Sequence, residues 1–166
     1  MTILNGLKIL DFSSLLPGPL ATMMFADLGA DVIHVESKNR VDLMRIMPPY
    51  DDDRESFIHQ HLHRSKRSLT LNLKTPEATE IVKKLIMDYD IIIEGFRPGV
   101  MKRLGIDFET LREVNPRLIY CAITGYGQTG PFALRPGHDN NYLAVAGVLD
   151  HSRLKDKKPV AMGIQI

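Results

Sequence analysis

The sequence has one cysteine, no tryptophan and almost no surplus of charge, with 21 Lys and Arg against 20 Asp and Glu. A lone cysteine, Cys121, cannot form an internal disulfide, so we expect a reducing, cytoplasmic location. The net charge of +1 argues against a nucleic-acid partner, because such proteins use surplus cations to release counterions from phosphates.

Long apolar runs and a secretory signal are also missing. No stretch approaches the ~18 apolar residues that cross a bilayer, and residues 1–8 lack a basic segment followed by an apolar one. The 166 residues are 44% hydrophobic and 25% charged, as in ordinary globular domains. We therefore expect one domain over residues 1–166, without a membrane partner.

Strand-like and helix-like patterns alternate along most of the chain. Strands are predicted at residues 7–12, 31–36, 69–73, 90–94 and 118–124. Helices are predicted at residues 17–28, 76–86, 98–104, 108–114 and 142–149. This alternation predicts an α/β fold, namely a Rossmann-like, open and mostly parallel sheet with flanking helices.

Local patterns also predict burial and helix starts. The apolar runs at 90–94 and 118–124 are typical of strands covered on both faces. Thr75 followed by Pro76 predicts an N-cap and the first helical residue. The first helix is predicted to bury one apolar stripe, formed by Leu20, Met23, Met24 and Leu28.

Residues 37–68 form a long excursion from the alternating pattern, with a helical turn or two expected near 54–63. His59, His61 and His63 could present three imidazoles to a metal ion if the segment were a strand. Nearby Arg and Lys side chains would repel a cation, and residues two apart do not share a helix face. We therefore favour a solvated polar face and expect no metal site.

The glycines at 125–130 match G-x-G-x-x-G, the pattern of dinucleotide-binding turns. That fingerprint requires a helix to follow, but Pro131 and Pro136 would stop one almost at once. We expect a loop that turns tightly or approaches a neighbour closely, and no NAD or FAD site.

Three cations follow predicted strands or flank a short helix. Lys74 stands after one strand, and Arg97 and Arg103 flank the helix that begins near Pro98. Ligands of open α/β sheets bind beyond the carboxyl ends of the strands. These cations could hold a polyphosphate such as a nucleotide or coenzyme A, although scattered surface charge is an equally simple interpretation.

A histidine next to an acid stands in the loop before the predicted helix at 142–149. His138 could act as a general base, because imidazole titrates near neutral pH. Alternatively, Asp139 is the N-cap of that helix and His138 packs beside it. Spacing alone favours the cap.

The chain resembles the N-terminal part of the family III CoA-transferases (CaiB/BaiF), which include α-methylacyl-CoA racemase. Order and spacing make the resemblance specific, and it runs almost from end to end. The matching stretches are LKILDF at 7–12, PGP at 17–19, DLGADVI at 27–33, KRSL at 66–69, LNLK at 71–74, EGFRPG at 94–99, RLG at 103–105, NPRLI at 115–119 and GYGQTGP at 125–131.

The resemblance implies a CoA thioester as ligand and no cofactor beyond its CoA moiety. Its CoA contacts carry over to Leu16, Leu71, Lys74, Gly95, Phe96, Arg97 and Arg103, with Gly137 near the thioester. Lys38 stands one position away from a basic residue of the family and is expected to replace it.

The stretch GHDNNY at 137–142 resembles the racemase branch, which implies that His138 is one of two groups that remove and return an α-proton. The second group, an Asp, is expected about two residues beyond Ile166. In the alternative, a CoA-transferase moving CoA between carboxylic acids, that Asp is the nucleophile. An alternative of another class is a non-catalytic nucleotide-binding module or one subunit of a split enzyme.

The apolar run at 159–166 ends without a cap, as if an element had been cut, and we expect a truncated chain. Because the resemblance implies a second catalytic group beyond Ile166, we also expect this chain to be inactive alone. The resemblance implies that a longer form is an interlocked homodimer acting on an acyl-CoA. This chain would then expose apolar surface, self-associate or require a complementary chain.

Overall fold

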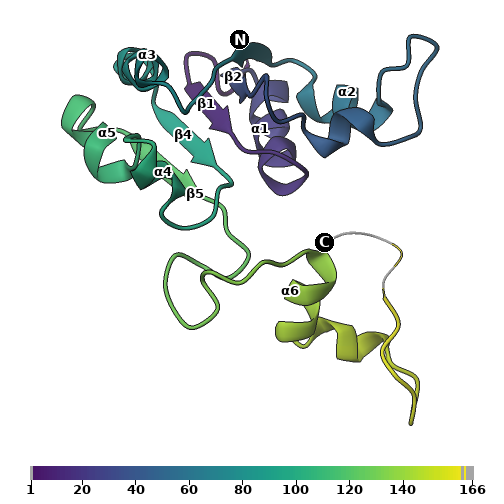
Figure 1. Ribbon diagram of the computed structural model, residues 1–166. Helices are drawn as coiled ribbons and strands as arrows, with labels where there is room; N and C mark the ends of the chain where they lie inside the picture. Colours follow the sequence, from purple (N-terminus) through teal and green to yellow (C-terminus); the bar gives the residue numbers. More distant parts are fainter. Residues whose placement is uncertain (1, 162, 164–166) are drawn as a thin grey trace. The chain divides into compact units, whose positions relative to one another are not determined.

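The structure, a computed structural model, describes residues 2–161 and 163 (Figure 1). Contacts within the chain divide it into two units, Met1–Ile123 and Thr124–Ile166. Each unit is described below by itself. The expectation of a single domain over residues 1–166 stays a prediction.

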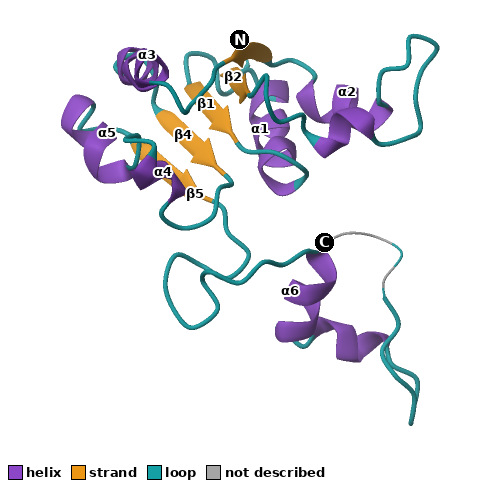
Figure 2. Ribbon diagram, viewed as in Figure 1, coloured by secondary structure: helices purple, strands orange, loops and turns teal. Residues whose placement is uncertain are grey.

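The described part of the first unit contains a sheet of five parallel strands (Figure 2). They are β1 (Lys8–Phe12), β2 (Asp31–Glu36), β3 (Arg67–Thr70), β4 (Ile91–Glu94) and β5 (Ile119–Ala122), in the order β3-β2-β1-β4-β5. The predicted open parallel α/β fold is confirmed. The chain order reverses at β1, which lies between β2 and β4, and such a reversal is where ligands of these folds bind.

The two faces of the sheet carry separate hydrophobic clusters. Alternation along β1 places Leu10 and Phe12 in one cluster and Ile9 in the other. The Leu10 cluster also holds Val82 of α3 (Pro76–Ile86), as well as residues of α4 (Val100–Arg103) and α5 (Phe108–Val114). The Ile9 cluster holds Ala26 of α1 (Pro17–Asp27). Both faces are therefore packed, as a doubly wound sheet requires.

The predicted start of α3 is correct, whereas the predicted buried face of α1 is only partly so. Thr75 caps α3, accepting the N–H of Ala78, and Pro76 is its first residue, as predicted. The predicted stripe on α1 is wrong for Met24 and Leu28, which are half exposed, whereas Met23 is buried. The residues of α1 that are buried are Gly18, Pro19, Thr22, Met23 and Ala26. These are mostly small, which lets α1 lie close to the sheet.

The predicted burial of the run at 118–124 is also wrong. β5 is an edge strand that pairs with β4 alone among the described strands. Ile119 is 59% exposed and Cys121 is exposed too. A β-branched and apolar composition predicts a strand, but it carries no information on whether that strand is central or at an edge.

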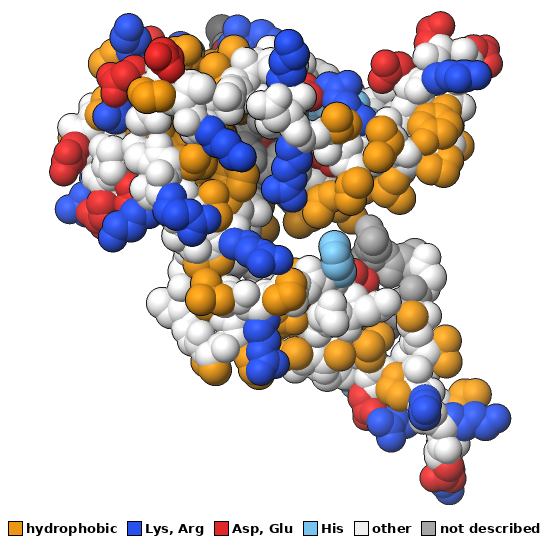
Figure 3. Space-filling view, in the orientation of Figure 1, with side chains coloured by type: hydrophobic (Ala, Val, Ile, Leu, Met, Phe, Trp, Pro, Cys, Tyr) orange, Lys and Arg blue, Asp and Glu red, His pale blue; other side chains and the backbone are white. Residues whose placement is uncertain are grey.

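The excursion after β2 contains the 3₁₀-helix η1 (Leu43–Ile46) and the helix α2 (Phe57–His63), which confirms helical structure near 54–63. Figure 3 shows apolar side chains gathered over this part of the surface. The exposed apolar residues there are Val41, Leu43, Ile46, Met47, Tyr50 and Phe57. Self-association of the chain stays a prediction.

The second unit holds α6 (Asp139–Val145) and the 3₁₀-helix η2 (Val148–Ser152). Gly147, in a left-handed conformation, separates them, so the helix predicted at 142–149 is divided. The glycines at 125–130 lie in turns with no helix following directly, as the prolines predict. Within the described residues, no helix is long and apolar enough to cross a membrane.

Candidate functional site

The carboxyl ends of parallel strands share one edge of a sheet, and most of the predicted site residues follow those ends. Leu16 comes after β1, Lys38 after β2, Leu71 and Lys74 after β3, and Gly95, Phe96 and Arg97 after β4. Arg103 ends α4, the helix that follows β4. The fold therefore brings residues from four segments of sequence to one edge, although their role in binding stays a prediction.

Two of these loops lie directly beside each other at the point where the strand order reverses. A Cβ atom on Gly95 would lie 3.6 Å from Cβ of Ser13 and 3.9 Å from the backbone nitrogen of Ser14. The loop after β4 therefore adjoins the loop after β1, and glycine keeps the space between them free of a side chain.

The amino end of α1 differs from that of a dinucleotide-binding helix. Pro17 and Pro19 have no N–H group, so the first turn lacks two of the donors that cradle a phosphate. Gly18 packs against the loop after β1, where an added Cβ would lie 2.1 Å from Ser13 Oγ. The first turn of α1 therefore offers an anion fewer backbone N–H donors than a dinucleotide-binding helix does.

Four cationic side chains at this edge are exposed and unpaired within the described residues. Lys38, Lys74, Arg97 and Arg103 are exposed, and none of them forms an ion pair with another described residue. By contrast, three other cations of the first unit have carboxylate partners at 2.6 to 2.7 Å, namely Arg45, Arg64 and Arg67. Exposed cations without a partner keep their attraction for an anionic ligand.

Buried carboxylates fix the two adjacent loops, and the sequence analysis did not identify them. Asp11 Oδ1 accepts the N–H of Ser13 at 2.9 Å, and Glu94 accepts the N–H of Phe96 at 2.7 Å. Both carboxylates lie within the last two residues of an apolar strand. That position was the signal available in the sequence, since a buried acid there is costly unless it has partners.

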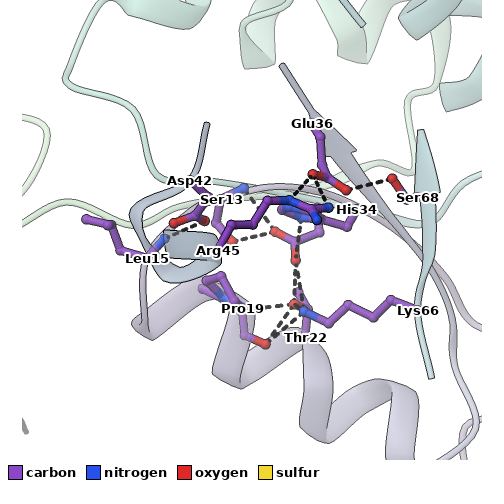
Figure 4. Close-up of polar contacts among 12 residues, drawn as sticks. Ser13, Leu15, Pro19, Thr22, His34, Glu36, Asp42, Arg45, Lys66 and Ser68 are labelled. Carbon is purple, nitrogen blue, oxygen red and sulfur yellow. Dashed lines mark hydrogen bonds and ion pairs between the residues drawn. The ribbon is translucent and has the colours of Figure 1, made fainter. Parts of the chain in front are cut away.

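Asp11 is held ionised by a polar cluster beneath α1. Lys66 Nζ lies 3.4 Å from Asp11 Oδ2 and donates to Thr22 Oγ1 at 2.7 Å and to the carbonyl of Pro19 at 2.9 Å (Figure 4). Burial by itself would raise the pKa of the Asp11 carboxyl. His34, Lys66 and the Ser13 hydroxyl outweigh it and hold that pKa well below its usual range.

For Glu94, the effect of burial on the carboxyl pKa outweighs that of its hydrogen bond. Its side chain is buried and forms no ion pair with any described cation, so burial raises the pKa of its carboxyl, while the hydrogen bond from Phe96 partly opposes that shift.

The histidines of α2 do not form the solvated polar face that the sequence favoured. His61 is exposed, but His59 is 7% exposed, and the ring of His63 lies 4.2 Å from His34 and 4.5 Å from His59. The expectation is therefore wrong for His59 and His63, because α2 turns them toward β2. Residues 2–161 and 163 contain no group of three or more His, Cys, Asp or Glu placed to hold a metal ion.

Gly137 and His138 lie in the second unit. His138, and not Asp139, is the N-cap residue of α6, so the cap prediction is wrong by one position. The N–H of His138 donates to Asn141 Oδ1 at 2.9 Å, and the Tyr142 hydroxyl donates to the Gly137 carbonyl at 2.6 Å. His138 is exposed, and its acid–base role stays a prediction. The expected Asp lies outside the described residues.

These features define a class: a doubly wound parallel sheet that carries exposed cations, unpaired among the described residues, at its carboxyl edge and has no glycine-rich start to α1. A profile of the family described as CoA-transferase family III matches residues 4–166, and the chain belongs to that family.

Individual relatives agree with this assignment. The chain is 39% identical to human succinyl-CoA:glutarate CoA-transferase over 161 residues, covering 97% of the chain and 37% of the relative. It is 38% identical to human alpha-methylacyl-CoA racemase over 159 residues, covering 95% and 37%. A CAIB/BAIF family protein from Brucella suis has a similar structure, with a TM-score of 0.90 and 38% identity, covering 98% of the chain and 44% of that protein. The chain therefore spans less than half the length of these relatives.

Proposed function

We propose that the chain is the CoA-binding portion of a CoA-transferase that moves CoA between carboxylic acids through an enzyme carboxylate. The observation that carries the binding step is the group of exposed, unpaired cations at the carboxyl edge. Lys74, Arg97 and Arg103 would bind the phosphates, and Lys38 would add a further charge. Leu16, Leu71 and Phe96 would contact the less polar parts of CoA beside Gly95. No cofactor beyond the CoA moiety is needed.

Transfer is favoured over racemisation by the relatives. Human succinyl-CoA:glutarate CoA-transferase and the succinate–glutarate CoA-transferase of Agrobacterium fabrum are 39% and 38% identical to the chain, and proteins named as CoA-transferases outnumber the racemase among its similar relatives. In such a transfer a carboxylate attacks the acyl carbonyl and CoA thiolate leaves, giving a mixed anhydride that the thiolate can attack in turn. Binding of the CoA phosphates would keep the thiolate positioned for that return.

Racemisation remains a second candidate because of His138. Its imidazole is exposed at the start of α6, where it could take an α-proton from an acyl-CoA whose thioester stabilises the enolate. A binding module without catalytic activity is the candidate of another class.

Two assays on a longer form that includes the expected Asp, with His138 intact and as His138→Ala, separate these candidates. One follows CoA transfer from succinyl-CoA to glutarate, and the other follows deuterium uptake at the α-carbon of a 2-methylacyl-CoA in heavy water. A transferase gives transfer that survives the substitution and no exchange. Exchange lost in His138→Ala would contradict transfer and indicate a racemase. CoA binding with neither reaction would indicate a binding module.

A further inference from the structure

One residue of the loop after β1 has a backbone conformation that its side chain disfavours. Leu15 has a φ of 65°, in the left-handed region that non-glycine residues seldom adopt. It directly precedes Leu16, the N-cap residue of α1, in the loop that adjoins Gly95. Strained residues persist only where their surroundings hold them, and they concentrate at ligand sites.

The residue that holds Leu15 comes from the excursion after β2. Asp42 Oδ2 accepts the N–H of Leu15 at 3.1 Å, and Asp42 Oδ1 accepts the N–H of Met44 at 2.9 Å (Figure 4). One carboxylate thus joins the loop after β1 to the first turn of η1, across 27 residues of sequence.

We propose that Asp42 is a positioning residue for the CoA site: it holds Leu15 in its left-handed conformation and thereby fixes the shape of the loop that carries Leu16. This inference rests on the proposed function, since it concerns the same edge of the sheet. Asp42 would thereby affect ligand affinity through Leu15, without contacting the ligand itself. The competing explanation is that Asp42 only caps η1.

A double-mutant cycle separates the two explanations. Asp42→Asn keeps the shape of the side chain but leaves a single acceptor oxygen for two N–H donors. We expect it to weaken CoA binding about tenfold. Glycine adopts positive φ without strain, so Leu15→Gly should reduce the effect of Asp42→Asn to less than about twofold. An undiminished tenfold loss in the Leu15→Gly background would overturn the proposal.

Asp51 provides a matched control within the same excursion. It also accepts backbone N–H groups, from Asp53 at 3.1 Å and from Glu55 at 2.8 Å. We expect Asp51→Asn to change CoA affinity less than about twofold, since its hydrogen bonds stay within residues 51–60. A loss as large as that of Asp42→Asn would mean that any disturbance of the excursion weakens binding.

Two measurements on the full chain keep this inference separate from the proposed function. Calorimetric titration with CoA gives the affinities, and amide hydrogen exchange of residues 13–16 reports on the loop. If the wild-type protein binds no CoA, the proposed function fails, and exchange still decides whether Asp42 orders the loop. Protection of the Leu15 amide in the wild-type protein, lost in Asp42→Ala, is the expected result. Equal exchange in both proteins would refute the role of Asp42.

Discussion

The candidate cations at the carboxyl edge of the sheet are free of carboxylate partners within the part of the chain that the structure describes. Lys74 and Arg97 are exposed and form no ion pair with another described residue, whereas Arg64 and Arg67 have carboxylate partners at 2.6 Å. A cation already paired gains little from an incoming phosphate. An unpaired one can form new charge-assisted hydrogen bonds with it.

Replacing one of these cations should weaken binding without unfolding the protein. We expect Arg97→Ala to lower CoA affinity about tenfold, with a smaller loss at higher salt because screening already weakens the contact. Calorimetric titration at two salt concentrations measures this.

Arg117→Ala is the matched control, since Arg117 is exposed but precedes β5 and so lies at the opposite edge. Equal losses in the two variants would show that general surface charge, and not the carboxyl edge, attracts the ligand.

Gly18 illustrates how tightly α1 packs on the loop after β1. A Cβ there would lie 2.1 Å from Ser13 Oγ and 2.2 Å from Ser13 Cβ. We expect Gly18→Ala to lower the free energy of unfolding by about 1 to 3 kcal/mol through this overlap. Urea denaturation measures the loss, and Ser13→Gly combined with Gly18→Ala should recover part of it. No recovery would place the strain elsewhere.

At the scale of elements, α2 contacts the sheet through imidazole rings, since the ring of His63 lies 4.2 Å from that of His34 in β2. Burial, helped by the charges of His34 and Lys66, lowers the pKa of His63 to about 3, and burial also lowers the pKa of His59. Both imidazoles therefore bind protons less readily in the folded protein than in the unfolded chain. They take up protons near pH 6.5 when the chain unfolds.

Stability should consequently fall as the pH drops below about 6.5, because the unfolded chain then binds more protons than the folded one. The slope per histidine is at most about 1.4 kcal/mol per pH unit, and partial solvent access reduces it. Unfolding of the wild-type protein and His63→Phe between pH 7 and about 5 tests this.

Other ionisable groups affect the same curve. The carboxyl pKa values of Asp11 and Glu36 are lowered, so the stability that these groups contribute is lost only at more acidic pH. The carboxyl pKa of Glu94 is raised, so its contribution to stability increases as the pH falls. His63→Phe should flatten the slope, while His61→Gln, at an exposed position, should leave it unchanged. Parallel curves for the wild-type protein and His63→Phe would contradict the assignment to His63.

The positions of helices and strands were more predictable from the sequence than which elements pack against one another. Thr75 with Pro76 predicted the start of α3, and strand and helix periodicity predicted the parallel sheet. The exposed edge at Ile119 and the inward rings of His59 and His63 were not predictable, because both depend on which element lies alongside. Local patterns report on backbone preference, and tertiary packing decides burial.

For the candidate site, the family motifs carried more information than residue chemistry did. They predicted residues that the fold brings to one edge, including Gly95 and Arg97. Asp42 escaped prediction because its role depends on a contact with Leu15 that only the folded chain creates.

For the whole molecule, the chain covers 37% of human succinyl-CoA:glutarate CoA-transferase, so the activity of any longer form is a proposal. The expected Asp and the expected interlocked homodimer concern residues or chains beyond those described. Binding of the CoA phosphates can be tested on this chain, since the cations proposed to hold them, Lys38, Lys74, Arg97 and Arg103, all belong to the unit Met1–Ile123.

Calorimetric titration of the wild-type protein with CoA and, separately, with NAD tests this binding most directly. The proline-interrupted start of α1 and the unpaired cations predict that CoA binds, with an affinity that falls as salt rises, and that NAD does not bind at the same concentrations. Binding of NAD without binding of CoA would contradict the assignment of this edge as a CoA site.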